Sequence, residues 1–280
     1  MLPRMIVDDL AEVLENRTLS AEYNVVTLAA GRVAAAARPG QFVMIKTAPG
    51  LDPLLRRPFS IFEIARDGDG RPRGISILNK RIGVGTGQLF DVRPGDRLAC
   101  LGPLGQPWPL VEPPNEAWMV AGGVGLAPFA TLTEALRARG VHLRLFYGAR
   151  RGDDLFHVDW FTERGVEVAL ATEDGSVGTH GRVTVPLGAA LAEAGQAARL
   201  AIYCCGPTPM MHAVATQALA AGHDAWVSLE QVMGCGMGGC YSCVVPVKMA
   251  DGSTHLVRSC TSGPVFAAST LHWEGLAHHG

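Results

Sequence analysis

The sequence lacks any long apolar run that could cross a membrane. Its longest uncharged stretch, residues 117 to 133, is interrupted by three glycines and a proline, whereas a spanning helix needs about 20 consecutive apolar residues. The first residues, MLPRMIVDDLAEVLENR, carry acidic and basic side chains and no apolar segment followed by a small-residue cleavage site. Because they do not resemble a signal peptide, we expect a cytoplasmic protein without a membrane partner.

Blocks of like charge are also missing. The 280 residues include 24 basic and 26 acidic side chains, for a formal net charge of -2, and this balance argues against nucleic acid as a partner. Cysteine is scarce but unevenly placed, since three of the seven cysteines lie in one loop, GCGMGGCYSC at 234 to 243. In a reducing compartment this crowding favours metal ligation over a disulfide framework.

Two patterns of predicted secondary structure divide the chain. Residues 18 to 105 hold short β-rich runs separated by Pro, Gly and Asp, which indicates an antiparallel barrel or sandwich. From residue 117 to about 224, strand runs alternate with helical periodicity, which indicates a parallel α/β sheet. We predict a multi-domain β and α/β protein with an N-terminal antiparallel β-barrel (1-112), a parallel α/β domain (113-225) and a small C-terminal metal-binding domain (226-280).

Two glycine turns are expected at the carboxyl edge of the parallel sheet. AGGVGLAPF at 121 to 129 joins a strand to a helix, and CGP at 205 to 207 follows a later strand. Such turns let the backbone approach a pyrophosphate at a helix N-terminus. A tight turn without a ligand is the alternative, because the spacing is not the usual GxGxxG. The residues of the predicted dinucleotide site are Gly122, Gly123, Gly125, Pro128, Cys205, Gly206 and Pro207.

Two anion-binding features in the β-rich part suggest a bound flavin nucleotide. In LRRPFSI at 55 to 61, Arg57 is able to pair with a phosphate, while Phe59 and Ser60 are able to contact a flat ring. GVGTG at 83 to 87 offers backbone amides and the Thr86 hydroxyl to an anion. The alternative for the first stretch is an edge strand with a solvated Arg and a packed Phe.

The cysteine loop has the spacing of a plant-type 2Fe-2S site. Cys235, Cys240 and Cys243 follow the pattern C-x4-C-x2-C, and Cys260 follows after sixteen intervening residues. Glycines around these positions allow the loop to wrap a cluster closely and to aim amide N-H groups at sulfur. Zinc and an accidental group of free thiols are the alternatives, although structural zinc sites usually present two compact ligand pairs.

Several motifs together resemble the electron-transfer subunits of bacterial NAD-dependent dihydroorotate dehydrogenase, which belong to the ferredoxin reductase superfamily. The resemblance spans about residues 18 to 266 and implies, in order, an FAD-binding barrel, an NAD-binding domain and a 2Fe-2S domain. The motifs are RPFS at 57-60, GVGT at 83-86, LGPLG at 101-105, AGGVGLAPF at 121-129, TEDGSVG at 172-178, CGPTPMM at 205-211 and CTSGPVF at 260-266.

The resemblance also implies roles for individual residues. The cluster ligands would be the four cysteines already named. The family's Leu-Tyr-Arg-like triplet aligns with Leu78, Asn79 and Lys80, where Asn79 replaces the aromatic residue and Lys80 keeps a cation. The residues implied to hold FAD in addition to this triplet are Arg57, Pro58, Phe59, Ser60, Gly85 and Thr86.

As a function, the resemblance implies an electron-transfer subunit in pyrimidine biosynthesis. It would pass electrons from an FMN-containing catalytic subunit, which oxidises dihydroorotate, through the cluster and FAD to NAD. It would form a heterotetramer of two of each subunit and would not oxidise dihydroorotate alone. No catalytic residue is predicted, because hydride transfer between flavin and nicotinamide requires no acid-base side chain.

Two alternatives to this function stay open. Similar subunits serve hydrogenases, sulfur reductases and transhydrogenases, and a zinc-stabilised nucleotide-binding regulator without turnover would belong to another class. The choice of NAD over NADP depends on the resemblance alone, since Arg150 and Arg151 after the second α/β strand are able to bind a 2'-phosphate.

Overall fold

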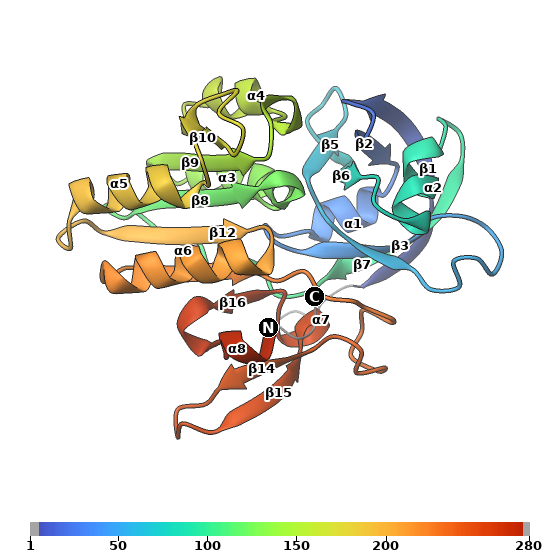
Figure 1. Cartoon of the computed structure of the whole chain (residues 1–280). Coiled ribbons are helices and arrows are strands. Elements are labelled where there is room, and N and C mark those ends of the chain that lie inside the picture. Colours follow the sequence, from blue (N-terminus) through green and yellow to red (C-terminus); the bar gives the residue numbers. More distant parts are fainter. Residues whose placement is uncertain (1–5, 277–280) are drawn as a thin grey trace.

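The computed structural model describes residues 6-276 and contains two seven-stranded sheets and a two-stranded hairpin (Figure 1). The strands are β1 Val7–Thr18, β2 Tyr23–Leu28, β3 Phe42–Lys46, β4 Arg57–Ser60, β5 Glu63–Arg66, β6 Pro72–Lys80, β7 Arg97–Leu104, β8 Glu116–Gly122, β9 Leu143–Ala149, β10 Glu167–Thr172, β11 Thr179–His180, β12 Leu200–Cys205, β13 Asp224–Ser228, β14 Val244–Lys248, β15 Thr254–Arg258 and β16 Val265–Ala267. The helices are α1 Gly31–Ala36, α2 Val84–Asp91, α3 Phe129–Arg137, α4 Val158–Thr162, α5 Thr184–Ala194, α6 Thr208–Ala220, α7 Ser259–Ser262 and α8 Trp273–Leu276.

The first sheet is antiparallel throughout, in the order β4-β3-β7-β1-β2-β6-β5. Its inner side chains form one buried cluster that includes Val26, Val43, Ile77 and Cys100. Strands β4 and β5 are separated by two residues, Ile61 and Phe62. The prediction did not include β1, the twelve-residue strand between β7 and β2.

The second sheet has the order β11-β10-β9-β8-β12-β13-β16, and its first six strands are parallel. Helices α5 and α6 contribute to the buried cluster on one face, and α3 and α4 contribute to the cluster on the other. The latter cluster also contains Val25, Phe62 and Leu78 from the barrel, so the two sheets share a core. The predicted fold class, an antiparallel barrel followed by a parallel α/β sheet and a small C-terminal unit, is confirmed.

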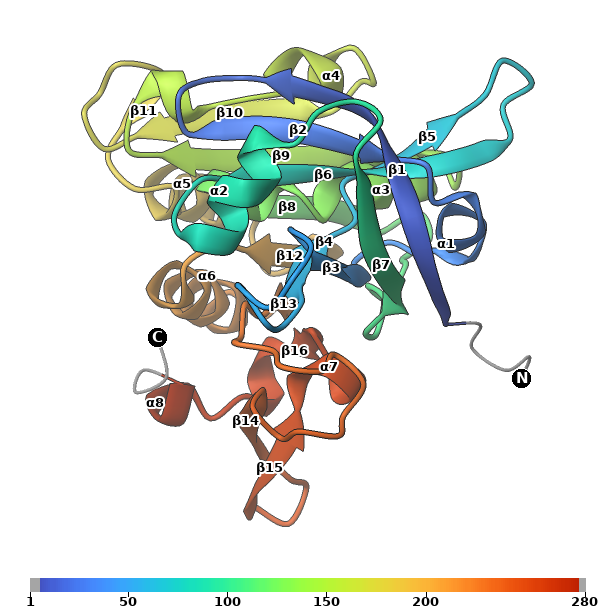
Figure 2. The ribbon, with the colours of Figure 1, turned by 90° about the vertical axis from the view of Figure 1, so that its right-hand side faces the viewer.

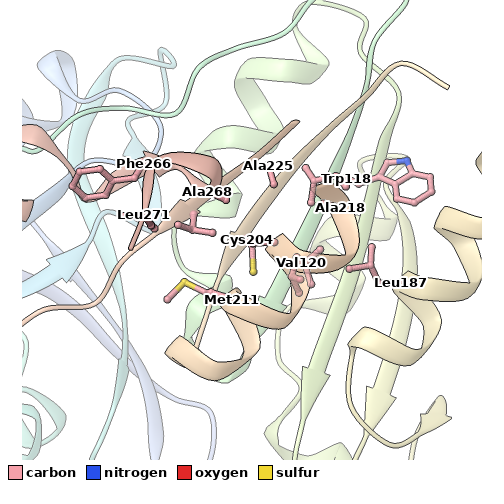
Figure 3. Packing of buried hydrophobic residues seen from close by; sticks show 14 of the residues in the cluster. Trp118, Val120, Leu187, Cys204, Met211, Ala218, Ala225, Phe266, Ala268 and Leu271 are labelled. Carbon is pink, nitrogen blue, oxygen red and sulfur yellow. The ribbon is translucent and has the colours of Figure 1, made fainter. Parts of the chain in front are cut away.

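The C-terminal segment returns to the second sheet after forming the hairpin β14-β15. Strand β16 pairs antiparallel with β13 through Trp226 with Ala267 and Ser228 with Val265. Phe266 and Leu271 pack with Cys204 and Met211 in the core of that sheet (Figure 3). The predicted boundary at residue 225 therefore falls inside β13, and the outer ends of the first and last predicted domains, residues 1-5 and 277-280, lie outside the described residues.

Figure 2 shows the hairpin β14-β15 projecting beyond the ends of both sheets, with α7 beside them. Within residues 6-276, no helix is long and apolar enough to span a bilayer.

Candidate electron-transfer site

The four predicted cluster ligands lie where the C-terminal segment meets the barrel. Cys235, Cys240 and Cys243 lie on the loop between β13 and β14, and Cys260 lies on α7. Cys243 and Cys260 are buried, whereas Cys240 is exposed and Cys235 is partly exposed. The buried pair packs in one apolar cluster with barrel side chains, namely Phe42, Met44, Leu101 and Leu104.

Backbone amides point at two of these sulfurs. The N-H groups of Met237 and Gly239 donate to Cys235 Sγ, with N to S distances of 3.4 and 3.2 Å. The N-H of Cys260 donates to Cys243 Sγ at 3.5 Å. Donors of this kind stabilise a thiolate or a cluster sulfur and raise the reduction potential of a bound iron-sulfur centre.

The thiols interact in two pairs. Hydrogen bonding by Ser242 and then by Cys235 lowers the pKa of the Cys240 thiol to about 6. Burial, followed by the neighbouring Cys243, raises the pKa of the Cys260 thiol to about 12. Two thiol pairs match the chemistry of a 2Fe-2S cluster, in which four cysteines ligate two irons.

Two glycines permit the close approach of the cysteine loop to its surroundings. Gly236 has φ 73°, and a Cβ there would lie 2.5 Å from Met44 Cγ of the barrel. Gly238 has φ 85°, and its Cβ would lie 3.0 Å from Thr261 Cγ2 beside Cys260. Any other residue would push the loop away from the barrel or from α7.

In the part of the chain that the structure describes, no three His, Cys, Asp or Glu side chains are grouped so as to hold a single metal ion. The choice between zinc and an iron-sulfur cluster therefore depends on the spacing of the four cysteines and on the comparison with known families.

The predicted phosphate-binding residues of the barrel lie together. A Cβ on Gly85 would lie 3.1 Å from Arg57 Cγ, so the arginine side chain passes directly over the start of α2. Thr86 Oγ1 accepts hydrogen bonds from the N-H groups of Ile82 and Gly83, both at 2.9 Å. The hydroxyl therefore fixes the turn before α2, and an anion would meet the backbone amides at the helix N-terminus.

Phe59 and Ser60 point to opposite sides of β4. The Phe59 side chain is 9% exposed and packs inside the barrel. Pro58 and Ser60, on the opposite side of β4, are half-buried.

The triplet at the end of β6 points to both sides of the sheet. Leu78 is buried in the core shared with the α/β sheet. Lys80 Nζ lies 5.1 Å from the centre of the Tyr23 ring and 3.6 Å from Glu22 Oε2. Asn79 is 1% exposed, and its Nδ2 donates to the Thr86 carbonyl at 3.0 Å. Asn79 therefore supports the first turn of α2 from inside the barrel.

Asn79 is the last member of a chain of carboxamides. Its Nδ2 also donates to Asn24 Oδ1 at 2.8 Å, and Asn24 Nδ2 donates to Asn16 Oδ1 at 2.8 Å. Asn16 Nδ2 in turn donates to the carbonyls of Phe90 and Val92 at the other end of α2. Three barrel strands thus hold α2 at both ends.

The two predicted glycine turns meet at the edge of the parallel sheet. Strands β8 and β12 are neighbours, with Ala121 opposite Cys205. A Cβ on Gly125 would collide with the Cys205 carbonyl, and a Cβ on Gly206 would lie 3.1 Å from the Gly122 nitrogen. Pro128 immediately precedes α3. The two turns therefore lie side by side at the edge of the parallel sheet where nucleotides bind in this fold class.

Arg151 faces carboxylates at the same edge. It lines a cavity of about 360 Å³ together with Asp153, Asp174 and Ser176, and its Nε lies 3.7 Å from Asp154 Oδ2. Negative side chains in this position oppose a 2'-phosphate.

Sequence reasoning missed residues that support the site without resembling a motif. Ser242 Oγ accepts from the Gly234 N-H at 2.9 Å and lies 3.2 Å from Cys240 Sγ. Arg258 contacts the cysteine loop, and the Tyr23 hydroxyl lies beside Gly123. Of these residues, only Ser242 could have been found from the sequence, because it lies between Cys240 and Cys243.

Known families match two parts of the chain. A model of the iron-sulfur cluster binding domain of dihydroorotate dehydrogenase B matches residues 230-272, and a model of the oxidoreductase NAD-binding domain matches residues 119-216. Among solved structures, an NADH-dependent reduced ferredoxin-NADP oxidoreductase studied for flavin-based electron bifurcation has a TM-score of 0.81 at 27% identity, covering 97% of this chain and 92% of that chain. The ferredoxin reductase in carbazole 1,9a-dioxygenase has a TM-score of 0.62 at 27% identity, over 78% of this chain and 67% of its own.

Curated relatives extend over nearly the whole chain. The dihydroorotate dehydrogenase B (NAD(+)) electron transfer subunit of Bacillus caldolyticus is 36% identical over 269 residues, which are 95% of this chain and 99% of the relative. The subunit of the same name from Fusobacterium nucleatum is 37% identical over 238 residues, 84% of this chain and 87% of the relative. The chain therefore belongs to the family of dihydroorotate dehydrogenase B electron transfer subunits, oxidoreductase subunits with a ferredoxin reductase-like fold.

Proposed function

We propose that this chain transfers electrons from an FMN-containing, dihydroorotate-oxidising catalytic subunit, through a 2Fe-2S cluster and FAD, to NAD. The step belongs to pyrimidine biosynthesis in the cytoplasm. Bound FAD would supply the exchange between single electrons and a hydride, so the chain's own task is to hold the cofactors in order and near one another.

The observation that carries this proposal is the difference in burial among the four cysteines. Cys243 and Cys260 are packed against β3 and β7 of the barrel, while Cys240 is open to solvent. A cluster held by all four would have one side toward the flavin-binding sheet and one side toward an incoming partner.

The barrel residues fit an FAD pyrophosphate. Arg57 lies over Gly85, and the amides at the start of α2 are unpaired by helix geometry. Arg57, Gly85 and the main chain around Thr86 would hold the phosphates, while Pro58 and Ser60 would face the rest of the nucleotide.

The glycine turns after β8 and β12 would hold the pyrophosphate of NAD. Gly125 and Gly206 leave the two backbones in contact, and Gly122 and Gly123 lie in the first of the two turns. The carboxylates beside Arg151 support NAD over NADP.

A docking surface for the catalytic subunit surrounds the exposed thiol. Large apolar side chains are open to solvent on the cysteine loop and on the barrel segment beside it, where Leu55 approaches Gly234. Apolar side chains gathered in this way are typical of protein interfaces. They are Leu54, Leu55, Val232, Met237 and Tyr241. We propose a heterotetramer of two of each subunit, and we propose that this chain alone does not oxidise dihydroorotate.

The test is to mix the purified chain with the catalytic subunit, dihydroorotate and NAD, and to follow NADH absorbance. We expect NAD reduction only with both subunits present. No NAD reduction, when both flavins and the cluster are shown to be present, would refute the proposal.

A second candidate is a subunit of a transhydrogenase, since the NADH-dependent ferredoxin-NADP oxidoreductase structure covers 97% of this chain. Reduction of NAD by reduced ferredoxin, without transfer from the dihydroorotate-oxidising subunit, would favour it.

A further inference from the structure

One cation touches the cysteine loop on both sides of Cys240. Arg258 is the last residue of β15, two positions before Cys260. Its Nη1 donates to the Gly238 carbonyl at 2.8 Å and lies 3.4 Å from the Tyr241 hydroxyl. The guanidinium carbon lies 4.9 Å from the centre of the Tyr241 ring.

Tyr241 has a backbone conformation that requires support. Its φ is 60°, in the left-handed region that non-glycine residues seldom adopt. The ring is 61% exposed, so core packing does not hold the residue in place. The half-buried guanidinium of Arg258 is the partner that the ring does have, through a cation-π contact and a hydroxyl contact.

The position of the charge matters as well as the contacts. Gly238 lies two residues before Cys240, and Tyr241 follows it directly. A guanidinium that contacts both residues therefore lies beside the loop segment that carries the exposed Cys240. Each electron accepted by an iron-sulfur cluster adds a negative charge, and a nearby cation stabilises the reduced form.

We propose that Arg258 is a positioning residue with two separable effects: its guanidinium holds the loop on both sides of Cys240 through Nη1 and the Tyr241 ring, and its charge raises the reduction potential of the cluster. The proposal rests on the proposed function, in which the four cysteines hold a 2Fe-2S cluster. Tyr241, with its left-handed backbone, is the loop residue whose ring and hydroxyl contact the guanidinium.

Two substitutions separate the effects. Arg258→Met removes both the charge and the guanidinium contacts, whereas Arg258→Lys keeps the charge without the planar guanidinium. The matched control is Lys248→Met, which removes an exposed cation from the opposite end of the same hairpin, where Lys248 pairs with Thr254 and Arg258 pairs with Val244.

The measurements are the midpoint potential of the cluster, followed by electron paramagnetic resonance during a redox titration, and the rate of iron loss to a chelator. For Arg258→Met we expect a more negative potential and several-fold faster iron loss. For Arg258→Lys we expect a potential near that of the wild type with faster iron loss. Lys248→Met should match the wild type in both measurements.

Wild-type potential and wild-type iron loss in both Arg258 variants would overturn the inference. If Arg258→Met fails to assemble a cluster, the Arg258→Lys variant provides the test. An unchanged rate of iron loss in that variant would refute the proposal that the guanidinium holds the loop. Wild-type protein without iron and sulfide would instead overturn the proposed function, and the inference with it.

Discussion

Cys243 and Cys260 differ from the two other cysteines of the site in their surroundings, and this difference is set by single residues. Burial against Met44 and Leu104 keeps water from one pair, while Ser242 stabilises the thiolate of Cys240. The spacing of the four cysteines was readable from the sequence. Their division into a buried and an exposed pair was not, because the barrel residues that bury them come from strands about 140 to 220 positions earlier.

We expect Cys260→Ser to lose most of the cluster, because a serine oxygen is a poor substitute for a thiolate toward iron. Iron content per chain and visible absorbance after removal of the flavin contribution measure the loss. Cys100→Ser is the control, since Cys100 lies buried in the barrel away from the site. Equal iron in Cys260→Ser and in the wild type would exclude Cys260 as a ligand.

At the glycine turns, we expect Gly125→Ala to weaken NADH binding by about tenfold or more, because the new methyl group collides with the Cys205 carbonyl and separates the turns. Titration of NADH against the flavin-loaded chain, followed by quenching of protein fluorescence, measures the change. Gly68→Ala is the matched control, with no neighbour within 4 Å. Unchanged NADH affinity in Gly125→Ala would place the nucleotide elsewhere.

Among the elements, α2 is supported by polar side chains from inside the barrel. The resemblance aligns Asn79 with an aromatic residue of the family triplet, and in this structure Asn79 donates to the Thr86 carbonyl. Sequence reasoning identified the substitution but not its function, because the partners Asn16 and Asn24 lie on other strands. The helix itself was missed, since GVGTG has the composition of a loop.

We expect Asn79→Leu to weaken FAD binding by about tenfold, which corresponds to about 1.4 kcal/mol and is within the range for an unsatisfied buried polar group. The substitution leaves the Thr86 carbonyl and Asn24 without this donor. Flavin fluorescence during titration of the flavin-free chain measures the affinity. Asn115→Leu is the control, because Asn115 makes a comparable bond to the Glu112 carbonyl on the surface. An unchanged FAD affinity would show that the carboxamide chain does not support the nucleotide site.

Strand β1 illustrates a second limit of sequence reasoning at this scale. Its run VDDLAEVLENRT alternates buried and exposed positions only in part, and its acids suggest a surface segment. The strand is specified instead by pairing with both β7 and β2. By contrast, β2, β3, β8 and β12 are short apolar runs, and their positions were predictable because burial on one or both faces requires that composition.

For the molecule as a whole, the order of the domains along the chain was predictable, but the pairing of a C-terminal strand with the α/β sheet was not. The change from β-rich runs to alternating strands and helices is visible along the chain. The return of β16 to the α/β sheet is not, because VFA is three residues long and gains its role only through pairing with β13.

We expect Phe266→Ala to lower the free energy of unfolding by about 3 kcal/mol, the usual cost of removing a buried phenyl ring. Phe266 packs with Cys204 and Met211 in the core of the NAD-binding sheet, so the loss should be seen in the whole chain and not only in the cluster segment. Chemical denaturation followed by far-UV circular dichroism measures it. Leu256→Ala, at an exposed position of the hairpin, should change stability by less than about 0.5 kcal/mol. Equal effects of the two substitutions would contradict a shared core.

The antiparallel pairing of β16 with β13 also has a consequence during synthesis. Residues 265-267 leave the ribosome after Cys260, the last of the four thiols. Until then β13 remains an open edge, and one side of the sheet lacks Phe266 and Leu271. Because chains fold from the N-terminus as they emerge, the NAD-binding sheet is completed only once every cluster ligand is available. A chain truncated before Cys260 would therefore have neither a finished sheet nor a full set of thiols.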